Sequence, residues 1–178
     1  RQWMHEIPAR RHIQRGTVLD VHHNILPLTA RNKPHASALW RADLRVKGFE
    51  DLYVLSREDM LLHTASHLFC NGEFDRGLRD LFDFFRLARE FSVDPQFWGN
   101  VAERARTLDL VEPLGYAVRY ANRLFNASIP TAFFQHAASG RLRFMDALFI
   151  RGLMPNHSSV HDAWTPAALF ALYVRGHY

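Results

Sequence analysis

The chain has 178 residues, of which 48% are hydrophobic and 22% are charged. This composition excludes a disordered chain, because it supplies enough apolar side chains for a buried core. The net charge of +4 is small and acidic residues are interleaved with basic ones, so the sequence gives no strong signal for nucleic-acid binding. The single cysteine, Cys70, excludes an internal disulfide and a thiolate-rich zinc site, and we expect a cytoplasmic protein.

No stretch of the sequence is apolar for long enough to cross a membrane. The longest such run, residues 167–174, is far shorter than the roughly 20 residues that a spanning helix needs. We therefore expect no membrane association. The chain begins with Arg1 rather than Met, and we expect it to be part of a longer protein.

The N-terminal third of the chain shows patterns typical of strands. Alternating side chains over residues 16–25 predict a strand. A short helix is expected over residues 34–42, because a proline suits the first turn of a helix. Residues 44–55 are typical of two short strands that turn at Gly48.

From residue 56 onward the periodicity is helical. Ser56, followed by Glu58 and Asp59, is typical of a helix start. A serine side chain at this position accepts a hydrogen bond from a free backbone N–H group. The negative charges of acidic side chains are stabilised by the positive end of the helix dipole. We expect this helix to end at residues 71–72 and a second helix, over residues 77–91, to fold back on it. The second helix is expected to bury Leu78, Leu81, Phe82, Phe85 and Leu87, and further helices are expected over residues 95–107, 110–126, 130–138, 141–154 and 165–175.

These patterns predict an α+β fold that is mostly α, with a small partial β-sheet on the N-terminal side followed by a helical bundle. We divide the chain into an N-terminal part, residues 1–55, and a helical C-terminal domain, residues 56–178. A truncated sheet would expose an edge strand and apolar surface, so we expect a homodimer formed through that edge.

The first candidate site lies on the strand predicted over residues 16–25. Asp20 and His22 share one face of this strand, about 6.5–7 Å apart along the chain. A carboxylate and an imidazole at that separation can share a divalent metal ion or act as an acid and a base. The alternative, which alternation alone favours, is the solvated face of a half-buried strand.

The second candidate is a pair of histidines, His63 and His67, which share one face of the first long helix. They could bind zinc in a metal-dependent hydrolase, with Asp80 or Asp83 as a third ligand, but the Glu that follows the first histidine in zinc proteases is missing. A hydrogen-bonded structural pair is therefore favoured. A further polar stretch, residues 157–162, is more typical of an exposed loop than of a metal site.

Several common catalytic motifs are absent from the sequence. It has no Gly-x-Gly-x-x-Gly or Walker-type loop, which excludes ordinary dinucleotide and P-loop sites, and no Gly-x-Ser-x-Gly, which argues against an α/β-hydrolase. One alternative to an enzyme therefore stays open. It is a non-catalytic helical module that binds a protein partner through exposed aromatic and arginine side chains, in particular from Thr131 onward.

Several segments in chain order carry a family resemblance. Residues 16–23, on a predicted strand, contain an acidic residue, an apolar residue and a histidine in this order. Residues 54–63, at the start of a predicted helix, contain leucine, serine, an acidic pair, leucines and a histidine. The segments are residues 5–8, 16–23, 54–63 with His67, 78–83 and 97–105. Over about residues 5–126 this order resembles the uncharacterised bacterial nucleotidyltransferases of the DNA polymerase β-like superfamily.

The resemblance implies an enzyme that transfers a nucleoside monophosphate from a nucleoside triphosphate to an unknown acceptor hydroxyl or amine through two Mg²⁺ ions. It implies that Asp20 is a catalytic, metal-binding carboxylate, that His22 is its active-site neighbour, and that the helices after Ser56 shape the acceptor pocket. His67 and Asp83 would form a structural bridge across the helical hairpin. The family's Gly-Ser turn and Asp-x-Asp pair are absent from the sequence, so we expect the C-terminal part of such an enzyme, catalytically incomplete by itself.

Overall fold

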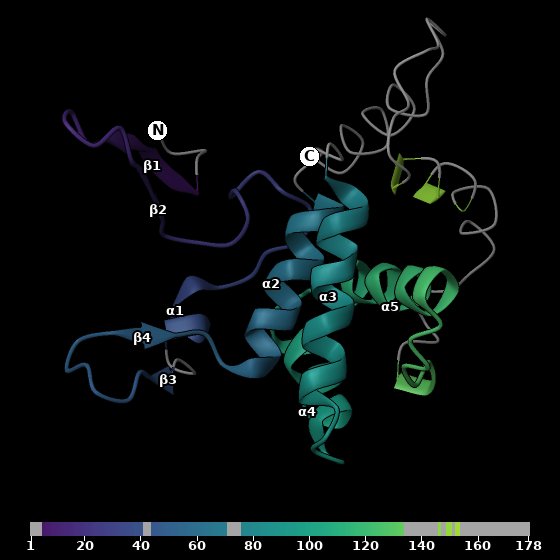
Figure 1. Ribbon diagram of the computed structural model, residues 1–178. Coiled ribbons are helices and arrows are strands. Elements are labelled where there is room, and N and C mark those ends of the chain that lie inside the picture. Colours follow the sequence, from purple (N-terminus) through teal and green to yellow (C-terminus); the bar gives the residue numbers. More distant parts are fainter. Residues whose placement is uncertain are drawn as a thin grey trace, which may run out of the picture.

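The computed structural model describes residues 5–40, 44–70, 76–133, 146, 149–150 and 152–153. Two small antiparallel sheets lie on the N-terminal side, and helices follow them (Figure 1). The predicted fold class, α+β and mostly α, is confirmed.

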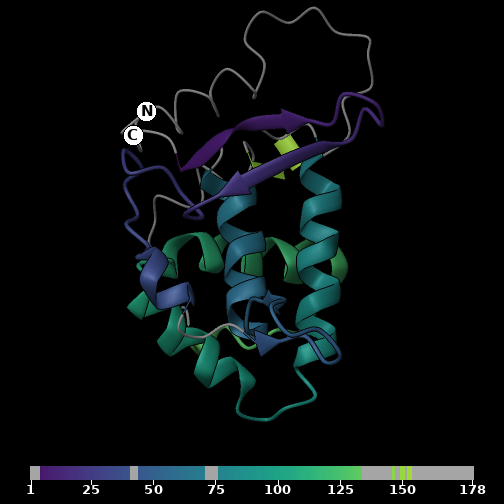
Figure 2. The ribbon, with the colours of Figure 1, turned by 90° about the vertical axis from the view of Figure 1, so that its left-hand side faces the viewer.

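The first sheet is a hairpin of β1 (Glu6–Arg11) and β2 (Val18–His22), with Glu6 directly opposite His22 and a shift of register farther along β1. Alternation predicts β2 but not β1. Every residue of β2 is exposed, so the half-buried strand that alternation favoured is wrong. Both faces of β2 are largely exposed, and the hairpin lies to one side of the helices, toward one end of α2 and α3 (Figures 1 and 2).

The next elements are α1 (Ala36–Trp40) and a second small sheet, in which β3 (Leu44–Arg45) pairs with β4 (Tyr53–Val54). Gly48 lies between these strands with a φ of 89°. This left-handed conformation is accessible to glycine at little cost. The predicted short helix and the two strands that turn at Gly48 are confirmed.

Two long helices form the centre of the molecule: α2 (Arg57–Cys70) and α3 (Gly77–Phe91). They lie side by side and run in opposite directions (Figure 1). Ser56 caps α2, because its Oγ accepts the backbone N–H of Asp59 at 3.1 Å. Both helices and the hairpin that they form are confirmed.

The described helices that complete the body are α4 (Phe97–Thr107) and α5 (Val111–Phe125). α5 crosses the central pair and contacts both of its helices, and α4 contacts α2 and α5 (Figures 1 and 2). The core lies between these four helices. Its largest fully buried side chains include Tyr120, Phe84, Phe97, Phe149, Leu61, Leu81 and Leu114.

Of the five residues predicted to be buried on α3, Leu81 is buried, Leu78, Phe85 and Leu87 are half-buried, and the prediction for Phe82 is wrong. Phe82 is 42% exposed, whereas Phe84 is fully buried. The buried face of α3 is formed by Leu81, Phe84 and Ala88, which repeat at intervals of three and four residues. Phe82 is about 100° from Leu81 around the helix, and its ring contacts Phe85 and Phe125 at the edge of the core.

Later predictions fall largely outside the described residues. The helix expected over residues 165–175 and the loop over 157–162 lie wholly outside them. The described residues within 141–154 are helical, whereas those of the helix expected over 130–138 form only a short 3₁₀ turn at residues 132–133.

A buried ion pair connects the N-terminal part to the helical body. The Arg104 guanidinium on α4 donates to both carboxylate oxygens of Asp59 at 2.7 Å and to the carbonyl oxygen of Ala38 at 2.8 Å. Asp59 is fully buried, and its hydrogen bonds raise the pKa of Arg104 above the usual value. This contact holds α1 against α2 and α4, and thereby fixes one wall of the cavity described next.

Candidate functional site

A cavity of about 450 Å³ lies between the end of β2, α1, β4 and α2. Its volume falls within the range of roughly 300–1,000 Å³ that is usual for small-molecule sites. The imidazoles of His22, His23 and His63 supply polar groups to a lining that is otherwise mainly apolar. The other lining residues are Asn24, Ile25, Ala36, Leu39, Trp40, Tyr53, Val54, Leu55 and Met60.

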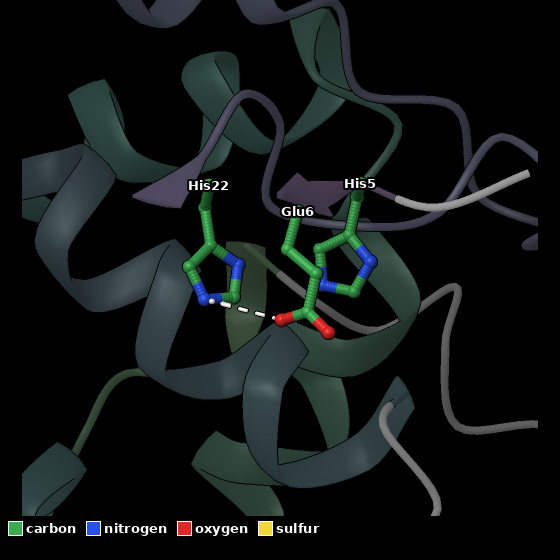
Figure 3. A group of neighbouring side chains, drawn as sticks. All are labelled: His5, Glu6 and His22. Atoms are coloured by element: carbon green, nitrogen blue, oxygen red, sulfur yellow. Dashed lines mark ion pairs between the residues drawn. The ribbon is translucent and has the colours of Figure 1, made fainter. Parts of the chain in front are cut away.

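Three side chains converge where the two strands of the hairpin meet beside this cavity (Figure 3). Glu6 is the cross-strand partner of His22, and its Oε2 lies 3.5 Å from the His22 Nε2. The His5 ring centroid is 5.2 Å from that of His22. One ligand atom from each of the three side chains lies within 4.8 Å of the others.

The backbone fixes this arrangement. The carbonyl oxygen of His5 accepts the backbone N–H of His23 at 2.9 Å and that of Asn24 at 3.3 Å. These bonds continue the pairing of the hairpin beyond the ends of β1 and β2. His5 is thereby held next to the end of β2, where His22 begins the lining of the cavity.

The histidines of the hairpin and of α2 influence one another's pKa values. Burial lowers the pKa of His5, and the nearby His22 lowers it further. Burial also lowers the pKa of His63, with smaller contributions from His67 and His22. A lowered pKa favours the neutral imidazole, which has a lone pair for a proton or a metal ion.

Asp20 lies on β2, two residues before His22, and is exposed. In the described part of the chain, the group of three ligands contains His22 with His5 and Glu6, and does not contain Asp20. The functional roles of Asp20 and His22 stay predictions. Sequence reasoning did not single out His5 and Glu6 as candidate ligands, although both lie in a segment that carries the family resemblance.

The other predicted histidine pair is arranged differently from a metal site. The ring centroids of His63 and His67 are 6.2 Å apart, and among the described residues neither belongs to a group of three metal ligands. The His67 Nδ1 lies 4.0 Å from a carboxylate oxygen of Asp80. The carboxylate that faces His67 across the hairpin is therefore that of Asp80, rather than that of Asp83.

Comparison with protein families identifies the class of protein that this fold and site belong to. A family model described as an uncharacterised nucleotidyltransferase matches residues 1–126, a segment that contains both sheets and α1 to α5. The chain therefore belongs to the uncharacterised nucleotidyltransferase family, and the predicted resemblance is confirmed. No curated protein and no solved structure matched the chain.

None of the described helices combines the length and the apolar character that crossing a bilayer requires.

Proposed function

We propose that this chain is part of an enzyme that transfers a nucleoside monophosphate from a nucleoside triphosphate to a small acceptor with a hydroxyl or amine group. Family membership supplies the class of reaction. The observation that carries the proposal is the position of the cavity: His22 lines it, and Asp20 precedes His22 on the same exposed strand. We assign the acceptor to the cavity, where His22 lies, and the nucleotide to the part of β2 around Asp20.

The metal ligands require a separate argument. Mg²⁺ takes oxygen ligands in near-octahedral geometry, and Asp20 offers one such carboxylate. Among the described residues no other carboxylate joins Asp20 in a group of three ligands, and the sequence contains no Asp-x-Asp pair. These residues do not fit a two-Mg²⁺ site by themselves. Asp20 is thus proposed as one ligand of a site that carboxylates from elsewhere would complete.

His22 is the candidate base for the acceptor. Its imidazole lines the cavity, so it can accept the proton that a hydroxyl or amine loses when it attacks the α-phosphate and displaces pyrophosphate. The Glu6 carboxylate, 3.5 Å from the His22 Nε2, would stabilise the imidazolium that forms. The apolar lining would hold the acceptor and exclude water that would otherwise compete with it.

The test uses the native full-length protein, nucleoside triphosphates labelled at the α-phosphate, Mg²⁺ and a mixture of small hydroxyl and amine compounds. Label should pass to an acceptor, and Asp20→Asn should abolish the transfer while circular dichroism stays unchanged. Asp51→Asn, an exposed change between β3 and β4, is the matched control. Val54→Trp should fill the cavity and raise the acceptor KM. Transfer that survives in Asp20→Asn would reject this role for Asp20.

A further inference from the structure

We propose that His5, Glu6 and His22 form a binding site for one late divalent transition-metal ion of the Zn²⁺ class. The three side chains point toward one another at the end of the hairpin (Figure 3). Each offers one ligand atom, and these atoms lie within 4.8 Å of one another. The proposal requires neither Asp20 nor a nucleotide, but it shares His22 and Glu6 with the proposed function. While the His22 imidazole binds an ion, its lone pair is not available to accept a proton from the acceptor, so the two roles of His22 exclude each other.

The donor set selects the class of metal. Two imidazole nitrogens and one carboxylate oxygen suit zinc and its neighbours, whereas Mg²⁺ and Ca²⁺ prefer sets composed of oxygen. Two histidines and one glutamate are also a known ligand set of zinc sites that keep a fourth position open. The site is therefore chemically distinct from the carboxylate site to which Asp20 is assigned.

The distances are compatible with a bound ion after small side-chain movements. In tetrahedral zinc sites with bonds of about 2.0–2.2 Å, neighbouring ligand atoms lie about 3.4 Å apart. The Glu6 Oε2 and the His22 Nε2 are already 3.5 Å apart. The other separations are at most 4.8 Å, and the exposed parts of the Glu6 and His22 side chains, 40% and 49% of their surface, leave room for the approach.

The backbone places the ligands before any ion binds. Glu6 and His22 are directly opposite each other in the hairpin, and the His5 carbonyl oxygen is hydrogen-bonded to the N–H of His23. An ion at this position would connect the beginning of β1 to the end of β2. It would also lie at the rim of the cavity, since His22 lines it.

The test is calorimetric titration of the full chain, free of any affinity tag and stripped of metal with a chelator, with Zn²⁺ and separately with Mg²⁺. One tight equivalent of Zn²⁺ is expected, and no comparable binding of Mg²⁺. Glu6→Gln and His5→Asn should each weaken the tight binding by at least about 100-fold, because even the loss of a group that only orients a ligand costs about 10- to 100-fold.

The control variant is His35→Asn, because His35 is exposed and lies outside the group of three ligands. The chain has 11 histidines, so weak binding to other imidazoles is expected in all variants and does not count as the site. Tight binding that survives in Glu6→Gln and His5→Asn, or that is lost equally in His35→Asn, would overturn the proposal. Equal affinity for Mg²⁺ would overturn the choice of metal.

A second readout separates this proposal from the proposed function. Co²⁺ in place of Zn²⁺ should give visible absorption that is lost in Glu6→Gln and His5→Asn. Asp20→Asn should keep this absorption and lose nucleotidyl transfer. Loss of the absorption in Asp20→Asn would contradict a site made of His5, Glu6 and His22 alone.

Discussion

The helical body and the N-terminal hairpin are stabilised in different ways. In the body, apolar side chains from four helices pack into one core, and large residues such as Leu61 and Leu114 are fully buried. In the hairpin, Leu19 is 62% exposed and Val21 40% exposed. The hairpin therefore depends on its own strand pairing and on bonds at its ends, and an isolated pair of strands is only marginally stable in water.

This difference has a chemical consequence. In the body, the buried Asp59 binds Arg104, and this contact holds helices together. The titratable groups of the hairpin, including Glu6 and His22, remain accessible to solvent. The body thus supplies rigidity, and the hairpin supplies side chains that can exchange protons or bind ions.

The largest effect is expected from the buried ion pair. Asp59→Asn should lower the free energy of unfolding by about 3–5 kcal/mol, because it leaves the Arg104 guanidinium without its buried counter-charge. The matched change in the hairpin is Glu6→Gln, which removes an exposed ion pair to His22 and should cost less than about 1 kcal/mol in the absence of metal. Urea unfolding followed by circular dichroism measures both. Equal losses would contradict the contrast between the two regions.

A similar effect is expected for packing. Leu114→Ala should lower the free energy of unfolding by about 2–5 kcal/mol, because Leu114 is fully buried and its truncation leaves a cavity. Leu19→Ala, the same change at an exposed position of β2, should stay within about 0.5 kcal/mol of the native chain. The same urea titration measures both variants. A cost above 2 kcal/mol for Leu19→Ala would show that the hairpin is packed against something else in solution.

The same contrast explains how much of the fold the sequence predicts. The bounds of α2 and α3 follow from local signals, a serine cap and a helical period of apolar residues, because a helix satisfies its hydrogen bonds within one segment. The position of Phe82 does not follow so simply. A residue at the margin of the apolar face of a helix is buried only if another helix packs against it. The sequence of its own segment does not determine that packing.

The candidate site is harder to predict than the fold. Asp20 and His22 are found by alternation along one strand, but Glu6 reaches His22 only through the register of two strands. That register depends on the turn before Gly16, where the N–H of Gly16 donates to the carbonyl oxygen of His12, and on the bulge in β1. A shift by one residue would move Glu6 to the other face of the hairpin. A turn signal at Gly16 was the available hint.

The smallest predicted effect concerns pH. In the body, the carboxylate of Asp146 accepts hydrogen bonds from the Arg119 guanidinium and from the Tyr120 hydroxyl. The bond from Arg119, more than that from Tyr120, lowers the pKa of Asp146 below its usual value of 3.8. A carboxyl group whose pKa is lower in the folded than in the unfolded chain stabilises the fold above the unfolded value. This stabilisation is lost as the pH falls through the folded value.

Asp146→Asn should therefore cost about 1–2 kcal/mol at pH 7, a value reduced by the partial exposure of Arg119. The difference from the native chain should shrink as the pH is lowered past 3.8, because the native carboxylate then becomes protonated as well. Asp20→Asn, on the exposed hairpin, should change stability by less than about 0.5 kcal/mol at either pH. Thermal unfolding at several pH values between neutral and acid measures both. A cost of Asp146→Asn that stayed constant across that range would show that its effect is one of packing, because only a charge effect disappears when the carboxylate is protonated.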